Sequence, residues 1–395
     1  MKRIFIIGAC RTPIGKMGGA LGTISSVELG SIVIKEVLQR SEIPLDRTDH
    51  VCMGCVIQAG LGQNVARQAS LKAGLSVETT AETMNIVCGS GLEAVNSAAR
   101  RIQCGDADIV VAGGMESMSN APFALMKARF GYRMGNPMMD SSLIDTMVND
   151  ALWDASYNCH MGITAENIAE KYRFSREELD IFALESQKKA IKTQESGGFK
   201  DEIVPVVVCE KKGKRIVDTD ENPRAEITIE KLSSLSPAFK PNGMVTAGNS
   251  SGINDGAAAV VLASEDKVRE MKLSPLAEWV DGTLAGGDPS IMGVVPVKSS
   301  QKLLNKLRMS IDDLDLVESN EAFASQSLAV QKELGIPNEK LNIRGGSIAL
   351  GHPVGASGCR ILVTLLYNMI HQNVHIGLAT LCIGGGMGCS TIIRR

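Results

Sequence analysis

An apolar run that ends on consecutive glycines occurs twice in this chain of 395 residues, at 109–114 and at 378–385. A second pair of similar segments, Cys-Gly-Ser-Gly at 88–91 and Gly-Ala-Ser-Gly at 355–358, comes before a helix-like stretch in each half. A chain of this length exceeds what one hydrophobic core usually organises. The matched segments therefore predict two similar halves, with the active site between them.

Short apolar runs alternate with amphipathic stretches at both ends of the chain, which predicts α/β units around a largely parallel sheet. Between them, methionine, glycine, proline and polar residues interrupt this pattern, so we expect an inserted domain there. One helix in it should begin after Ser175, because Glu178 follows at capping-box spacing. We expect a first α/β half at 1–114 and 246–272, an inserted loop domain at 115–245, and a second half at 273–395.

The predicted strands and helices follow from periodicity and from residues that start and stop such elements. The strand expected at 108–112 should end at Gly113 and Gly114. Expected strands lie at 2–7, 51–57, 108–112, 257–262, 276–280 and 377–382, and expected helices at 27–40, 64–73, 91–104, 298–307 and 324–334.

Charge and composition exclude several classes of function. The net charge of −3 argues against a broad nucleic-acid surface, and no apolar run approaches the roughly 20 residues of a membrane span. The first residues are too briefly apolar for a signal peptide, so we expect a cytoplasmic protein with reduced thiols. The Cys52 and Cys55 pair lacks partners at zinc-site spacing, so we expect no metal site.

Cys88 lies in the segment 85–91, Asn-Ile-Val-Cys-Gly-Ser-Gly, where a strand gives way to a helix beginning near Ser90. The amides and dipole of a helix N-terminus stabilise an anion and lower the pKa of a thiol. The flanking glycines let a substrate approach the sulfur. We therefore predict that Cys88 is a nucleophile rather than a buried structural cysteine.

His352 stands in the glycine-rich segment 345–358, Gly-Gly-Ser-Ile-Ala-Leu-Gly-His-Pro-Val-Gly-Ala-Ser-Gly. Glycine costs stability, so such a cluster indicates special dihedral angles or close approach by a ligand or backbone. His352 is the natural base for a thiol. His50, His371 and His375 are expected in polar turns, without a catalytic setting.

Cys382 closes an apolar run and is followed by three glycines, beginning with Gly384. Exposed amides in such a turn can hold an oxyanion, and a second thiol can move a proton at carbon if its pKa is tuned near neutrality. Standing alone, this motif is better explained as a turn after a core strand.

Taken together, the three segments resemble the thiolase family over essentially the whole chain. The resemblance implies a thiolase-like α/β fold of two pseudo-symmetric halves in five layers, α-β-α-β-α, with a loop domain inserted in the first. It implies coenzyme A thioesters as substrates, no tightly bound cofactor, fatty acid metabolism, and a homotetramer built as a dimer of dimers. Further matching motifs lie at 11–15, 113–119, 249–256 and 320–323.

The resemblance also implies catalytic roles. Cys88 becomes acylated and His352 activates it, while Cys382 exchanges the α-proton of the second acyl group. Asn320, through a water, joins His352 in one oxyanion hole. The amides of Cys88 and Gly384 form the other.

The segment His160-Met161-Gly162 resembles the version in thiolases that act on acetoacetyl groups, which implies interconversion of two acetyl-CoA with acetoacetyl-CoA plus CoA. The segment 123–146 is longer than in compact bacterial biosynthetic thiolases and carries Lys127, Arg129 and Arg133. By resemblance, the pantetheine and nucleotide path is lined by Leu152, Arg224, Ser251, Ala322 and Phe323.

Three alternatives remain at this point. A degradative 3-ketoacyl-CoA thiolase of broader chain length would share the cysteines, but the His160-Met161 pair counts against it. A ketoacyl synthase-like condensing enzyme typically lacks a second catalytic cysteine, so Cys382 counts against that one. A non-catalytic relative would have lost catalytic residues, and all four expected positions are filled here.

Overall fold

The first half of the molecule is an α/β unit whose elements come from both sides of an insertion. The computed structural model describes residues 2–132, 134, 143–211 and 213–395. Ser25 and Glu28 form a capping box at the start of the first long helix. The elements are β1 (Ile4–Arg11), β2 (Gly15–Lys16), α1 (Ser26–Arg40), η1 (Leu45–Arg47), β3 (His50–Gly54), α2 (Val65–Ala73), β4 (Thr80–Met84), α3 (Ser90–Cys104), β5 (Ile109–Ser117), β12 (Asn254–Ser264) and α7 (Glu265–Met271).

The second half repeats this arrangement nearer the C-terminus. Its long helices end on residues in the left-handed conformation, Arg308, Gly335 and Asn373, which stop each helix before the next strand. The elements are β13 (Ala277–Gly286), η5 (Pro289–Val294), α8 (Val295–Leu307), β14 (Leu316–Ser319), α9 (Ala324–Leu334), α10 (Ser347–Leu350), α11 (Val354–Gln372), β15 (Ile376–Ile383) and β16 (Met387–Arg394).

The strand order confirms the predicted pseudo-symmetry. The first half runs β1-β12-β5-β3-β4 and the second runs β13-β16-β15-β14, and the two join where β1 pairs antiparallel with β13. In both halves the first two pairs are antiparallel and the third is parallel. Antiparallel pairs outnumber parallel ones among the described strands of this sheet, so the expectation of a largely parallel sheet is wrong. A register shift occurs between Ile6 and Gly8 in one half and between Trp279 and Asp281 in the other, at the corresponding strand pairs.

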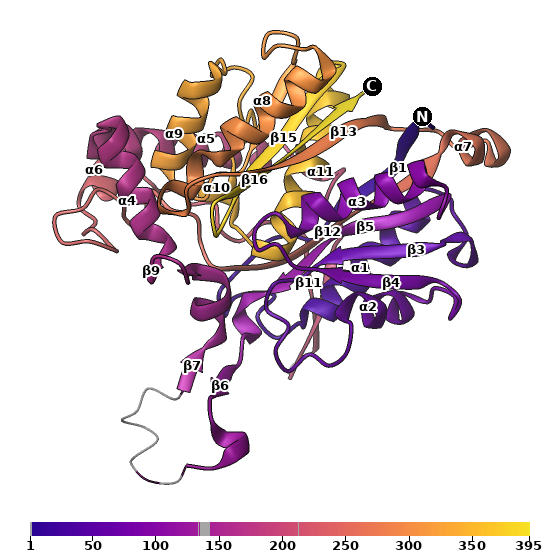
Figure 1. The fold of residues 1–395 in the computed structure, drawn as a ribbon, viewed down its shortest axis with the longest axis horizontal. Helices are drawn as coiled ribbons and strands as arrows, with labels where there is room; N and C mark the ends of the chain where they lie inside the picture. Colours follow the sequence, from indigo (N-terminus) through magenta and orange to yellow (C-terminus); the bar gives the residue numbers. More distant parts are fainter. Residues whose placement is uncertain (1, 133, 135–142, 212) are drawn as a thin grey trace.

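Helices α3 and α11 form the middle layer between the two parts of the sheet (Figure 1). Side chains alternate along β5, with Val110 in the central cluster and Val111 in the outer one. The central cluster also contains Leu92 of α3 and Leu362 of α11. Helix α1 covers the outer face of the first half and α8 that of the second, which completes five layers.

Glycines let the two central helices touch near their N-termini. A Cβ atom on Gly91 would lie 2.9 Å from the backbone nitrogen of Cys359, and one on Gly358 would lie 2.4 Å from that of Leu92. Helices α3 and α11 both begin beside this contact, so the segments just before them, which carry Cys88 and His352, meet between the halves. The paired Gly-containing motifs of the sequence therefore position the site.

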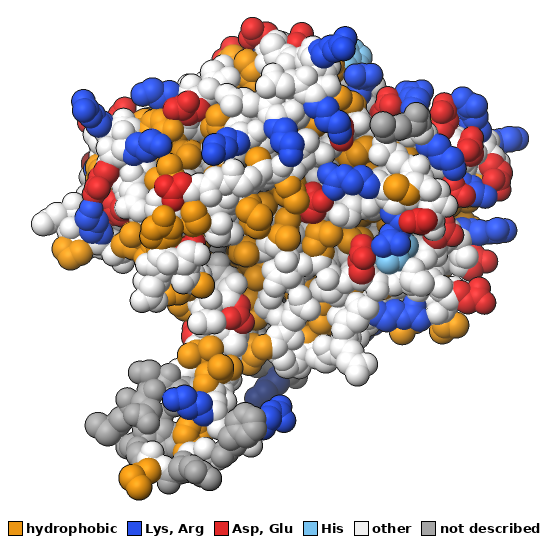
Figure 2. All heavy atoms as spheres, viewed as in Figure 1, with side chains coloured by type: hydrophobic (Ala, Val, Ile, Leu, Met, Phe, Trp, Pro, Cys, Tyr) orange, Lys and Arg blue, Asp and Glu red, His pale blue; other side chains and the backbone are white. Residues whose placement is uncertain are grey.

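The segment between β5 and β12 packs beside this core and extends into an arm, which Figure 1 shows projecting with β6 and β7. On the face drawn in Figure 2, basic and acidic side chains are interspersed, and apolar ones gather toward the centre. Arg133 lies outside the described residues. The elements are η2 (Met118–Asn120), β6 (Phe123–Leu125), η3 (Ala128–Phe130), β7 (Leu143–Asp145), η4 (Val148–Leu152), β8 (Trp153–Asp154), β9 (Cys159–His160), α4 (Met161–Tyr172), α5 (Arg176–Glu195), β10 (Val206–Glu210), β11 (Gly213–Val217) and α6 (Ile229–Ser233).

Two expectations about local structure are wrong. Strand β5 does not end at Gly113 but continues to Ser117, because it stays paired with β12. The glycines allow close packing there: a Cβ on Gly113 would lie 2.1 Å from the Ala258 carbonyl oxygen of β12, and one on Gly114 would lie 2.0 Å from the Gly355 carbonyl oxygen of α11. His50 is not in a turn but begins β3, and His371 lies in the last turn of α11. The capping box of Ser175 and Glu178 is confirmed at α5.

Candidate active site

A cavity of about 470 Å³ brings together most of the residues singled out in the sequence. Cys88 and His352 line it, although they come from different halves of the molecule. No group of three or more His, Cys, Asp or Glu suited to a metal occurs in the described ranges. The other predicted residues that line the cavity are Leu152, His160, Met161, Arg224, Ser251, Ala322 and Phe323.

Cys88 lies on a strained turn just before α3. Val87 has a φ of 52°, in the left-handed region that β-branched residues rarely adopt. The Ser90 hydroxyl holds the turn closed, since it accepts from the Ile86 amide at 3.0 Å and donates to the Val87 carbonyl at 2.6 Å. Sequence reasoning missed this strain, because nothing in the residue types marks a valine as left-handed.

The Cys88 side chain is 9% exposed, and burial raises the pKa of its thiol to about 11. The backbone N–H groups of Gly384 and Cys88 itself act in the opposite direction but do not outweigh burial. The expectation of a lowered pKa at the helix start is therefore wrong for the free protein. Cys88 rests as a neutral thiol and needs a base when it reacts.

His352 has the properties that such a base needs. Burial, with a smaller effect from the charge of Arg360, lowers the pKa of His352 to about 3, so the imidazole is neutral near pH 7. Its backbone N–H donates to Asn254 Oδ1 at 2.8 Å, and its Nδ1 lies 2.6 Å from Ser357 Oγ. Its Nε2 is buried without a hydrogen-bond partner in the part of the chain that the structure describes.

Cys382 and Gly384 lie at the end of β15, against the Cys88 turn. Cys382 is fully buried and packs with Met161 and Phe323 of the cavity wall. Burial, and then the proximity of Cys88, raises the pKa of the Cys382 thiol, which contradicts the expectation of a value near neutrality. The Gly384 N–H points to the sulfur of Cys88, as a donor for an oxyanion there must.

Asn320 directly follows β14 and is fully buried. Its Oδ1 accepts from the Ser347 hydroxyl at 2.6 Å, and its backbone N–H donates to the Thr380 carbonyl at 3.0 Å. Its Nδ2, like His352 Nε2, has no hydrogen-bond partner among the described residues. His352 lines the 470 Å³ cavity, whereas Asn320, Cys382 and Gly384 are not among its lining residues. A bound polar group or water would satisfy two such buried nitrogens.

Glu116 ties the two halves together beneath the site. Its carboxylate accepts from the amides of Val56 at 2.9 Å, Ile57 at 3.2 Å and Gly355 at 2.9 Å. Burial raises the pKa of Glu116 to about 7, although these amides lower it. Glu116 fixes the start of α11 and hence the approach of His352. The sequence placed it in a matching motif without assigning it this task.

Three rings form one wall of the cavity. His160 stacks on Phe239 with centroids 4.7 Å apart, and Phe239 meets the edge of Phe323 at 6.1 Å. A Cβ on Gly162 would lie 2.2 Å from Phe239, so glycine is required there. His160 Nδ1 accepts from the Gly162 amide at 3.0 Å, which leaves Nε2 to carry the proton of the neutral ring. Phe239 had no signal in the sequence.

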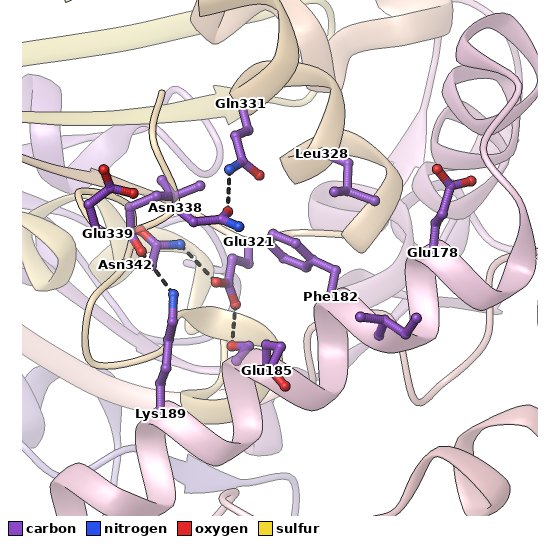
Figure 3. A pocket seen from close by; sticks show the side chains of 13 residues that line it. Glu178, Phe182, Glu185, Lys189, Glu321, Leu328, Gln331, Asn338, Glu339 and Asn342 are labelled. Atoms are coloured by element: carbon purple, nitrogen blue, oxygen red, sulfur yellow. Dashed lines mark hydrogen bonds between the residues drawn. The ribbon is translucent and has the colours of Figure 1, made fainter. Parts of the chain in front are cut away.

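A larger cavity of about 630 Å³ lies between α5 and α9. Figure 3 shows Glu321, next to Asn320 in the chain, at its wall. Glu321 accepts from Ser186 at 2.6 Å and from Asn342 at 2.8 Å, so both of its oxygens are engaged. This cavity holds no cysteine or histidine, which leaves the 470 Å³ cavity as the candidate active site.

Arg224 links the candidate site to its surroundings. It lines the cavity and also a smaller hollow that contains Lys231 and Leu235. Two basic side chains beside an apolar surface suit a ligand with a phosphorylated end and an apolar arm.

None of the described helices is long and apolar enough to cross a membrane.

Comparison with known proteins gives matches over almost the whole chain. Residues 4–266 match the family model of the thiolase N-terminal domain, and residues 273–395 match that of the thiolase C-terminal domain. An acetyl-CoA acetyltransferase of Syntrophomonas wolfei is 54% identical over 395 residues, covering 100% of this chain and 99% of the relative.

Two solved structures share the fold over 100% of this chain and 99% of their own. The Bacillus anthracis acetyl-CoA acetyltransferase has a TM-score of 0.97 at 44% identity. The human mitochondrial 3-ketoacyl-CoA thiolase has a TM-score of 0.95 at 40% identity.

Proposed function

The chain belongs to the thiolase family, and from this premise we propose that it is an acetyl-CoA C-acetyltransferase. It interconverts two acetyl-CoA with acetoacetyl-CoA plus CoA, through an acetyl group carried on Cys88. The observation that carries the proposal is the shared cavity of Cys88 and His352, with Cys382 buried beside them.

In the first half-reaction Cys88 attacks the thioester carbonyl carbon of acetyl-CoA. The thiol is neutral at rest, so His352 Nε2 takes its proton as the new carbon-sulfur bond forms. The carbonyl oxygen becomes negative, and the amides of Cys88 and Gly384 stabilise it. The bond to CoA then breaks, and the leaving thiolate takes the proton from His352.

In the second half-reaction Cys382, as a thiolate, removes a proton from the methyl group of another acetyl-CoA and becomes a neutral thiol. The resulting carbanion attacks the acetyl carbon on Cys88, and the Cys88 sulfur leaves and takes that proton from Cys382. Burial keeps Cys382 a neutral thiol in the free protein, so it must lose its own proton before this step.

The oxygen of the second acetyl-CoA carries negative charge while its methyl group lacks a proton. The two unsatisfied nitrogens, His352 Nε2 and Asn320 Nδ2, support a hole for that oxygen, with a water joining Asn320 to it. The hole for the acetyl oxygen on Cys88 is a separate one. The two half-reactions thus use different donors, and variants can separate them.

A short acyl group is favoured over the long chains of a degradative 3-ketoacyl-CoA thiolase. The stacked His160 and Phe239 close the wall of the cavity next to Phe323. The relatives named acetyl-CoA acetyltransferase support the same choice over that thiolase and over a ketoacyl synthase.

From the family resemblance we also propose that the protein uses coenzyme A thioesters as substrates without a tightly bound cofactor. We propose further that it is a cytoplasmic homotetramer in fatty acid metabolism. The sequence pattern supports domain boundaries at 114/115, 245/246 and 272/273.

Steady-state kinetics tests the substrate. The value of kcat/KM for thiolysis of acetoacetyl-CoA should exceed that for a six-carbon 3-ketoacyl-CoA. A preference for the longer substrate would overturn the assignment to short acyl groups.

A further inference from the structure

We infer that Arg360 and Ser347 are positioning residues that polarise Asn320 and strengthen its Nδ2–H as a donor, through a water, to the oxygen of the second acetyl-CoA. The inference rests on the proposed function and deepens it. The inference depends on a row of three hydrogen-bonded groups, which runs from the Arg360 cation through Ser347 to the Asn320 amide.

The row begins at a buried guanidinium. Arg360 lies on α11 and is 1% exposed, and its Nη2 donates to Ser347 Oγ at 2.7 Å. Ser347 in turn donates to Asn320 Oδ1 at 2.6 Å. The proton count is consistent, since the hydroxyl accepts once and donates once. Asn320 Nδ2 has no partner among the described residues and so remains free to donate.

Arg360 is poorly satisfied as a structural residue. Its Nε and Nη1 have no hydrogen-bond partner in the described ranges, although the group is buried. Burial lowers the pKa of Arg360, and the nearby acidic groups of Glu318, Glu202 and Glu321 oppose this effect only through space. A buried charge with so few direct partners is costly.

The electrostatic effect of this arrangement falls on the amide. A cation that donates to Ser347 makes the hydroxyl a stronger donor, and that hydroxyl draws electron density toward Asn320 Oδ1. The Nδ2–H bond becomes more positive, which favours contact with a developing negative oxygen in a site of low dielectric. The charge of Arg360 also helps to keep His352, the second donor of the pair, neutral before reaction.

The test separates the two half-reactions. Ser347→Ala cuts the row and leaves the charge, while Arg360→Met removes the charge. Ser327→Ala is the matched control, since it deletes a buried hydroxyl that bonds only to its own helix, at the Phe323 carbonyl, and to the neighbouring Gln326. Acetylation of Cys88 is followed by mass spectrometry, and exchange of the acetyl-CoA methyl protons in heavy water by NMR.

Ser347→Ala should slow methyl exchange and condensation about tenfold to a hundredfold, because loss of a whole oxyanion donor costs about 10²–10³ in rate. The KM for acetyl-CoA and the rate of Cys88 acetylation should stay within about threefold of wild type. Combined with Asn320→Ala, Ser347→Ala should have no further effect on exchange. Ser327→Ala should behave as wild type in both steps.

Three results would overturn the inference. These are unchanged methyl exchange in Ser347→Ala, an equal loss of acetylation and exchange, and effects of Ser347→Ala and Asn320→Ala that multiply. If Arg360→Met does not fold, Ser347→Ala still decides. A wild-type protein that takes no acetyl group on Cys88 would instead refute the proposed function, and this inference with it.

Discussion

His352 Nδ1 lies 2.6 Å from Ser357 Oγ, and the same hydroxyl lies 2.9 Å from the Pro353 carbonyl oxygen. The hydroxyl has one proton, so it can donate to only one of these groups at a time. When it donates to Pro353, Nδ1 carries the ring proton and Nε2 is a base. When it donates to Nδ1, Nε2 carries the proton and serves as a donor. One serine thus permits both roles proposed for His352.

Replacement of Ser357 tests this relationship. Ser357→Ala removes the group that orients the ring, so kcat should fall by about tenfold or more, since a positioned base is worth 10²–10⁴ in rate. The free energy of unfolding should fall by only about 1 kcal/mol, the value of one buried hydrogen bond. Kinetics and urea unfolding measure the two effects. A loss of activity that merely follows a loss of folded protein would contradict the orienting role.

Cys382→Ser should separate acyl transfer from chemistry at carbon. The nucleophile Cys88 remains, so acetylation and exchange of labelled CoA with acetyl-CoA should persist. Proton transfer at the methyl group should drop by about 10²-fold or more, because a serine hydroxyl is a far weaker acid than a thiol. Equal loss of CoA exchange and condensation would show that Cys382 has no separate task.

Phe239→Ala should widen the substrate range. Removing the ring that stacks on His160 opens the cavity wall, so kcat/KM for a six-carbon substrate should rise relative to acetoacetyl-CoA by about tenfold, the value of one or two accommodated methylenes. Phe174→Ala is the control, because Phe174 is buried in a different cluster. An unchanged ratio in Phe239→Ala, or an equal rise in Phe174→Ala, would show that this wall does not set chain length.

Glu318 gives the unfolding free energy a pH dependence of known sign. Burial raises the pKa of Glu318 to about 8, above its ordinary value of 4.5, so the folded state holds a proton that the unfolded state has lost between these values. Its stabilising contribution is complete below about pH 4.5 and is lost as pH rises toward 8. Relative to Glu318→Gln, wild type should lose about 1.4 kcal/mol per pH unit in this window.

Chemical unfolding of both proteins at pH 5, 6 and 7 measures that slope. The amide keeps a partner for Asn368, which donates to the Glu318 carboxyl at 2.9 Å. A difference between the two proteins that does not change with pH would contradict the raised pKa.

Much of the fold was predictable because its signals are local. The capping-box spacing at Ser175 predicts the start of α5, and the helix expected at 64–73 agrees within one residue with α2. The end of β5 was not predictable. Gly113 suits a turn by residue type, and only the approach of a strand distant in the sequence explains its place inside the sheet.

The site residues also fall into two groups, those that local motifs predict and those that depend on contacts between distant segments. Cys88, His352 and Cys382 stand in glycine-rich motifs that mark them in the sequence. Phe239 stands in no motif, and its role depends on stacking with a residue about 80 positions away, which no local pattern encodes. The neutral state of Cys88 was also missed, because the burial that sets its pKa is a property of the assembled halves.

Mass spectrometry after incubation with acetyl-CoA tests the central claim most directly. Wild-type protein should carry one acetyl group on the peptide that contains Cys88, and Cys88→Ser should carry none there. Addition of CoA should remove the group and restore the free thiol. An acetyl group found only on another peptide, or no acetyl group at all in folded protein, would contradict acyl transfer through Cys88.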